Sequence, residues 1–181
     1  MKKLILLLLF IPLVSLGQDF RKMNFGDTKE QLKEAYPDVE FLFDSEEGME
    51  MLYHEGNIAW IKTQIGYVFL NNKFTIGSYV FAENDYLRSD EERVRDYKNV
   101  SNRLNEKYDM EDFTEWYKTD YKDDPAFALN INHVSFREDY GDEKLYIIHT
   151  LAKESSTISH SVVYATKEFA EMMMNQSDDD F

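Results

Sequence analysis

Polar and apolar residues follow a helical spacing in a short segment near the N-terminal end of the chain. Thr28 and Gln31 have the spacing of a capping box, in which each side chain satisfies a free backbone N–H of the first turn. Leu32 and Tyr36 then share one face, and Pro37 cannot continue a helix. The pattern predicts a short helix over residues 28–36.

A second and longer helical pattern begins at Ser89, which forms another capping box with Glu92. Apolar residues recur at three- and four-residue steps as far as Tyr108, which predicts a helix of about five turns. The segment KEFAEMMM, residues 167–174, is typical of a closing helix, with its methionines placed to dock on a sheet.

Most of the remaining chain consists of runs rich in aromatic and β-branched residues, which favour strands. Short turns separate successive runs, which favours antiparallel pairing. The sequence therefore predicts an α+β fold, an antiparallel sheet with the helices packed on one face. The expected strands are MEMLYH, NIAWIK, GYVFL, KFTIGSYVF, FALNINHVSF, KLYIIHTL and TISHSVVY, and we expect Trp60 and Trp116 to lie in the core.

The pair Asn71 and Asn72 separates two of these runs. Asparagine tolerates a positive φ better than most residues, so the pair suits the two-residue turn that matches strand twist. The pattern predicts a hairpin here, with Phe69 facing Phe74 and Tyr67 facing Ile76.

The two halves of the chain share a short motif, Leu-x-Glu-x-Tyr, in QLKEAY at 31–36 and RLNEKY at 103–108. Each copy precedes a series of predicted strands, which indicates two tandem helix-then-strands units over 18–86 and 87–181, the second with a C-terminal helix and acidic tail. Recurrence by chance is the alternative, because the motif fixes only three positions.

The N-terminal residues have the layout of a secretory signal peptide: two lysines, an apolar run from Leu4 to Val14, and small residues at 15 and 17. The apolar run is about half as long as a membrane-spanning helix. We interpret 1–17 as a cleaved signal peptide and expect a periplasmic or secreted chain without a stable membrane anchor. A short buried helix is the competing interpretation.

Composition narrows the possible functions. The formal net charge of −15 repels nucleic acids and anionic lipids, so neither is an expected partner. The absence of cysteine excludes thiol chemistry and favours a bacterial envelope over a disulfide-rich secretion. No Gly-x-Ser-x-Gly elbow or glycine-rich phosphate loop is present. We therefore expect no catalytic residue and no cofactor.

The run FGDTKEQLKEAYP, followed by paired strands around YVFLNNKF, resembles the helix-then-hairpin pattern of small outer-membrane assembly lipoproteins of the SmpA/OmlA type. Those proteins are similar in fold to β-lactamase-inhibitor-protein units, which also occur as a tandem pair. The resemblance implies a related α+β fold and an accessory role in envelope assembly, and it assigns no functional residue.

His149 and His160 form the most specific candidate site in the sequence. Each histidine interrupts an otherwise apolar strand face, and a hairpin loop over 152–157 would place the two directly opposite each other. Two opposed imidazoles could share a proton, bind zinc with a nearby carboxylate, or be satisfied by neighbours in the core. The sequence nominates no further metal ligand.

These observations predict an exported, non-catalytic binding or interaction protein whose partner is a protein or a small ligand. An envelope hydrolase using carboxylates and histidine is one alternative. An accessory factor in envelope assembly is the other. A deep cleft holding histidine and acidic residues would favour the enzyme.

We expect signal peptidase to cleave the exported chain between Gly17 and Gln18, because small residues occupy the two positions that such enzymes recognise. Intact-mass measurement of the exported protein tests this directly. Recovery of residues 1–17 on a membrane-bound product would contradict both the cleavage and the expected location.

Overall fold

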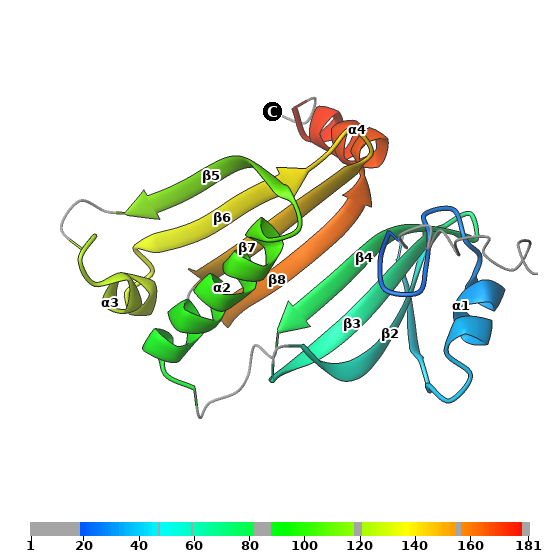
Figure 1. Cartoon of the computed structure of the whole chain (residues 1–181), viewed down its shortest axis with the longest axis horizontal. Helices are drawn as coiled ribbons and strands as arrows, with labels where there is room; N and C mark the ends of the chain where they lie inside the picture. Colours follow the sequence, from blue (N-terminus) through cyan, green and yellow to red (C-terminus); the bar gives the residue numbers. More distant parts are fainter. Residues whose placement is uncertain are drawn as a thin grey trace, which may run out of the picture.

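Figure 1 shows the computed structural model, which describes residues 19–46, 48–58, 60–81, 88–117, 121–154 and 157–178. The predicted signal peptide at 1–17 lies outside the described residues. Within the described part, no helix has the length and apolar character needed to cross a membrane.

Twelve helices and strands follow one another in the described residues. They are α1 (Lys29–Ala35), β1 (Leu42–Glu46), β2 (Met49–Ile58), β3 (Ile61–Leu70), β4 (Lys73–Phe81), α2 (Asp90–Asn105), β5 (Asp109–Tyr117), α3 (Pro125–Asn130), β6 (Val134–Gly141), β7 (Leu145–Glu154), β8 (Thr157–Thr166) and α4 (Lys167–Asp178).

The strands form one eight-stranded sheet in the order β1-β2-β3-β4-β8-β7-β6-β5, with every neighbouring pair antiparallel. Each half of the chain contributes four strands preceded by a helix, and the second half adds α3 between β5 and β6 and α4 after β8. The halves meet where β4 pairs with β8. The helix α2 lies across one face of the sheet (Figure 1). The predicted α+β fold with an antiparallel sheet is confirmed.

The first two helices begin where their capping boxes predict. Thr28 and Gln31 exchange side-chain and backbone hydrogen bonds at the start of α1, and Ser89 and Glu92 do so at the start of α2. These reciprocal bonds satisfy N–H groups that have no partner inside a helix. The start of each helix is therefore encoded locally.

The repeated motif makes the same local structure in both halves. The backbone N–H of Tyr36 donates to the carbonyl of Leu32 over 3.1 Å, and Tyr108 donates to Leu104 over 2.8 Å. Both leucines are buried in the same core cluster. Both copies of Leu-x-Glu-x-Tyr therefore anchor the C-terminal end of a helix in the core, although Tyr36 is the C-cap of α1 and Tyr108 lies two residues beyond the C-cap of α2.

Phe20 joins the two halves of the core although it precedes the first helix. Its ring centroid lies 5.5 Å from that of Tyr67, 4.9 Å from Tyr79 and 5.2 Å from Tyr164. Only 2% of the side chain is exposed. A Cβ atom on Gly77 would lie 2.4 Å from the Phe20 ring, so this strand position has room only for glycine.

The predicted Asn-Asn hairpin is confirmed, but one of its two predicted pairs is wrong. Asn71 and Asn72 have φ values of 51° and 61°, and Phe69 pairs with Phe74. The register then shifts between Val68 and Phe69, and Tyr67 pairs with Gly77 instead of Ile76. A β-bulge that inserts one extra residue causes this shift.

Two predicted strands have different structures. The run NIAWIK, at 57–62, contains the turn between β2 and β3, since Ile58 pairs with Ile61. The first part of FALNINHVSF forms the helix α3, because the Asp124 side chain accepts a hydrogen bond from the backbone N–H of Phe127 and Pro125 occupies the first helical position. The edge strands β1 and β5 were not among the predicted runs.

We predict that Asn71→Val destabilises the protein by about 1–2 kcal/mol, because a β-branched residue resists the left-handed conformation. Asn71→Gly keeps that conformation accessible and serves as the matched control. Urea unfolding measures both variants. Equal stability of the two would show that this turn does not depend on a positive φ.

Candidate functional site

The rings of His149 and His160 meet inside the core. The two Nε2 atoms lie 3.0 Å apart, and only 0% and 7% of the respective residues are exposed. Their strand register differs from the prediction: Leu151 pairs with His160, and His149 pairs with Val162. The strands extend to Glu154 and Thr157, so the loop is shorter than expected and the histidines become diagonal neighbours.

A carboxylate from the next strand completes the chain of polar groups. Glu138 on β6 pairs in register with His149, and its Oε2 atom lies 3.1 Å from His149 Nδ1. The hydroxyl of Tyr140 donates to the same oxygen over 2.6 Å. We call Glu138, Tyr140, His149 and His160 the histidine network.

The helix α2 and strand β4 enclose this network. The ring of Tyr97 stacks on His149 with centroids 4.0 Å apart, and Ser101 Oγ lies 3.4 Å from His149 Nδ1. On the side of β4, the Phe81 ring lies 4.2 Å from the His160 ring. Aromatic rings therefore cover both imidazoles.

Burial determines how the network is protonated. It lowers the pKa of His149, although Glu138 acts in the opposite direction. Burial also lowers the pKa of His160 well below its ordinary value, and the positive charges of Arg88 and Arg93 add to the effect. Burial raises the pKa of Glu138, but hydrogen bonds led by that of His149 outweigh it, and the net shift is downward.

These shifts define the direction of each hydrogen bond. Since Glu138 is ionised and His149 is neutral, Nδ1–H of His149 donates to the carboxylate. His149 Nε2 is then an acceptor, and it receives Nε2–H of His160. The network is a fully paired chain from Tyr140 to His160.

Such a chain could act as a general base only if a reactant could reach it. The space beside His160 has a volume of about 20 Å³ and is lined by Ile61, Phe81, Arg88, Arg93, Asp96 and Ile158. That volume is enough for one water molecule. The geometry therefore favours a structural role for the histidine network.

The geometry does not favour zinc at the two histidines. Glu138 contacts Nδ1 of His149, whereas the two histidines face each other through Nε2. Among the described residues, no group of three or more histidine, aspartate or glutamate side chains is arranged to hold a metal ion. Two imidazoles alone fall short of the three or four protein ligands usual for zinc.

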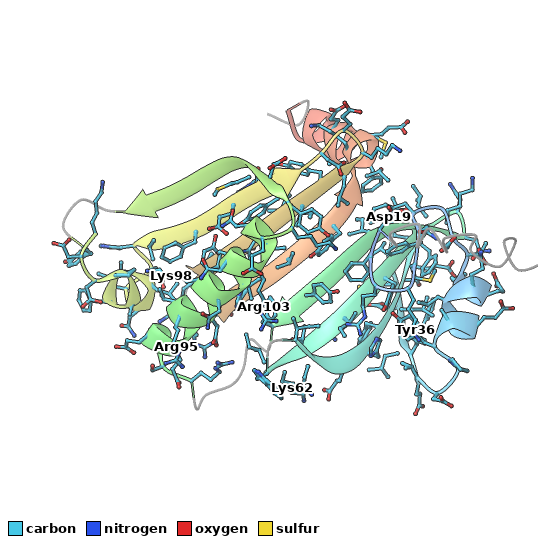
Figure 2. The ribbon with its side chains drawn as sticks, viewed as in Figure 1. Asp19, Tyr36, Lys62, Arg95, Lys98 and Arg103 are labelled. Atoms are coloured by element: carbon cyan, nitrogen blue, oxygen red, sulfur yellow. The ribbon has the colours of Figure 1, made fainter. Side chains whose placement is uncertain are left out.

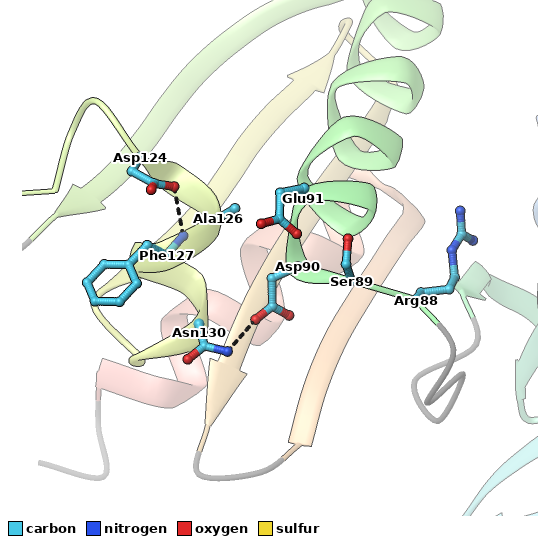
Figure 3. A pocket seen from close by; sticks show the side chains of 8 residues that line it. All are labelled: Arg88, Ser89, Asp90, Glu91, Asp124, Ala126, Phe127 and Asn130. Atoms are coloured by element: carbon cyan, nitrogen blue, oxygen red, sulfur yellow. Dashed lines mark hydrogen bonds between the residues drawn. The ribbon is translucent and has the colours of Figure 1, made fainter.

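A larger and more polar hollow lies between the N-terminal ends of α2 and α3 (Figure 3). Its volume is about 500 Å³. The Asn130 amide donates to Asp90 over 2.9 Å and ties the two helices together, while Asp124 caps α3. These carboxylates already hold helix ends, so their presence here is explained by the fold.

A third space, which we call the α2 pocket, lies between the C-terminal half of α2 and strands β2, β4 and β8. Its volume is about 150 Å³. Apolar and aromatic side chains make most of its wall, and two cations contribute to it, Arg103 of α2 and Lys107 just after the end of that helix. Unlike the histidine network, it is open to small molecules.

Trp60 lies at the tip of the hairpin between β2 and β3. Its side chain is 96% exposed, and its backbone has a φ of 72°. The expectation that Trp60 belongs to the core is therefore wrong, because the pairing of Ile58 with Ile61 places it in the turn. Trp116 belongs to β5, and its side chain lies outside the described part.

The sequence prediction missed the residues that give the histidines their partners. The core face of β6 carries Phe136, Glu138 and Tyr140 at alternate positions. A carboxylate between two aromatic residues on such a face was the sequence feature that could have identified Glu138 as a buried partner. Glu138 and Asp139 are adjacent acidic residues of the same strand. They point to opposite faces, and Asp139 binds Arg137 through two hydrogen bonds.

We predict that stability falls as the pH drops below about 6.5, the value at which unfolded histidine titrates. The pKa values of His149 and His160 are lowered in the folded state, so the unfolded state binds more protons below that pH. For each histidine that stays neutral in the folded state, the free energy of unfolding should fall by about 1 kcal/mol between pH 6.5 and 5.5.

Urea unfolding at the two pH values measures this loss, and His160→Asn should reduce it by about half. The control variant Phe43→Ser changes an exposed residue outside the network and removes no titratable group, so it should leave the loss unchanged. An identical pH dependence in all three proteins would contradict the assignment of neutral, buried histidines.

Comparison with protein-family models, curated proteins and solved structures finds no match to the chain. The role of each residue above is therefore derived from its own contacts, burial and charge. No residue assignment is transferred from another protein.

Proposed function

We propose that the protein is an exported, non-catalytic binding protein of the bacterial cell envelope, and that the tip of the β2–β3 hairpin contacts its partner. The single observation that supports this proposal is Trp60, which is 96% exposed in a left-handed backbone conformation. The signal-peptide layout of residues 1–17 supports export.

Trp60 contributes little to the stability of the isolated chain. A non-glycine residue in the left-handed region costs about 1–2 kcal/mol, and this side chain recovers almost nothing by burial. Tryptophan is also among the residues most enriched in the energetic centres of protein–protein interfaces. A large aromatic group at an exposed, strained tip is therefore explained better by an interface than by the fold.

The alternatives have weaker support. A hydrolase would need its histidine and carboxylate on a cleft, whereas the space beside His160 has a volume of about 20 Å³. An accessory role in envelope assembly is supported only by the α+β fold, in which each half places a helix before its four strands, and it differs from the leading proposal only in the identity of the partner.

Capture of partners from envelope extract tests the proposal. The immobilised chain should retain a partner that Trp60→Gly fails to retain. The variant Phe43→Ser removes another exposed aromatic group, on the edge strand β1, and should capture the partner normally. Identical capture by the wild type and Trp60→Gly would contradict a contact at the hairpin tip.

Trp60→Gly should not lose stability, and it should gain up to about 1 kcal/mol, because glycine accepts the positive φ without strain. Thermal unfolding of the purified variant measures this. A marked loss of stability would show that Trp60 supports the fold, and the captured partners would then have no bearing on a binding role.

A further inference from the structure

The α2 pocket has the dimensions of a small-molecule site. Its volume of about 150 Å³ matches that of an apolar protein cavity known to hold a benzene molecule. The residues that line it come from both halves of the chain: Ile58, Tyr79 and Phe81 from the first half, and Val100, Arg103, Leu104, Lys107, Tyr108, Val162 and Tyr164 from the second.

Aromatic side chains form a large part of the pocket. The ring centroids of Tyr79 and Tyr164 lie 5.8 Å apart at near-perpendicular planes, and Tyr108 lies 6.3 Å from Tyr164 in the same kind of arrangement. Edge-to-face contacts of this kind are favourable, and a further aromatic ring could extend them.

Two positive charges stand on the α2 side of the pocket. Arg103 is in the last turn of α2, and Lys107 lies two residues beyond the end of that helix. Both are exposed, and no carboxylate is among the lining residues. Within the part of the chain that the structure describes, neither cation forms an ion pair. Lys107 Nζ lies 4.8 Å from the centroid of the Tyr108 ring, so this ammonium group sits over one of the aromatic residues that line the pocket.

The positive charge of these two residues contrasts with the charge of the whole chain. Aspartate and glutamate together number 35, against 20 lysines and arginines. Two cations that form no ion pair with any described residue, beside an apolar pocket, therefore present a local positive field in an acidic protein.

Tyr164 contributes a hydroxyl group to the wall of the pocket. The residue is 8% exposed, and its side chain makes no hydrogen bond to any described residue. Burial raises the pKa of Tyr164, so the hydroxyl remains a donor at neutral pH. A hydroxyl at the wall of a pocket can donate to water or to a ligand acceptor.

We propose that the α2 pocket binds a small aromatic carboxylate. The ring of the ligand occupies the apolar space among Val100, Leu104 and Val162, and its carboxylate pairs with Arg103 and Lys107. This inference is separate from the partner contact at Trp60, so either proposal can fail without the other.

Three probes that share one phenylpropyl skeleton test the ligand class: 3-phenylpropionate, 3-phenylpropan-1-ol and 3-phenylpropylamine. They are titrated into the mature chain, residues 18–181, and followed by amide chemical shifts. The anion should bind more tightly than the alcohol, the amine should bind least, and the shifts should cluster at Val100, Leu104 and Val162. Equal binding of all three probes, or shifts elsewhere, would overturn the proposal.

The double variant Arg103→Gln/Lys107→Gln should weaken binding of 3-phenylpropionate about tenfold, as expected for two partly exposed ion pairs. It should leave binding of the alcohol unchanged. Arg95→Gln/Lys98→Gln makes the same change in net charge on the same helix, at the positions labelled in Figure 2, and should have no effect. An equal loss in both double variants would assign the effect to net charge and overturn the site.

Trp60→Gly should bind the probe normally, which separates this result from the test of the hairpin tip.

Discussion

The pairing of β4 with β8 is the interaction on which the architecture depends. Ile76 to Val80 run antiparallel to Ser161 to Ala165, and this contact converts two four-stranded units into one continuous sheet. Each unit alone would expose an open strand edge at this position. The shared face also lets α2 pack Val100 and Leu104 into the same core cluster as Tyr67 of the first half. The α2 pocket lies on that face, with walls from α2, β2, β4 and β8.

Local chemistry explains which parts of the fold could be predicted from the sequence. Capping boxes at Thr28 and Ser89 and the Asn-Asn turn involve residues only a few positions apart, and the structure contains all three. The misplaced elements depend on interactions that residue patterns do not show. A bulge moved Tyr67 from Ile76 to Gly77, and the cap at Asp124 converted an apparent strand into α3.

The same reasoning applies to the candidate site. Period-two alternation placed His149 and His160 on one face, and their rings do meet, but through a diagonal contact set by a shorter hairpin. Glu138 could not be assigned as their partner without knowing that β6 lies beside β7. Trp60 was misassigned because an apolar sequence context does not distinguish a strand from the tip of a turn. The α2 pocket combines residues from both halves, so only the assembled sheet reveals it.

The position of Phe20 has a consequence for the order of folding. Its ring contacts Tyr67 and Tyr79 of the first half and also Tyr164, which lies near the opposite end of the chain. Contacts between residues so far apart in sequence close large loops, and they form late because of the entropy lost on closure. The socket for Phe20 is complete only after β8 has paired with β4. Phe20 therefore takes its place in the core at the end of the folding reaction, and its ring then holds together strands from both halves of the sheet.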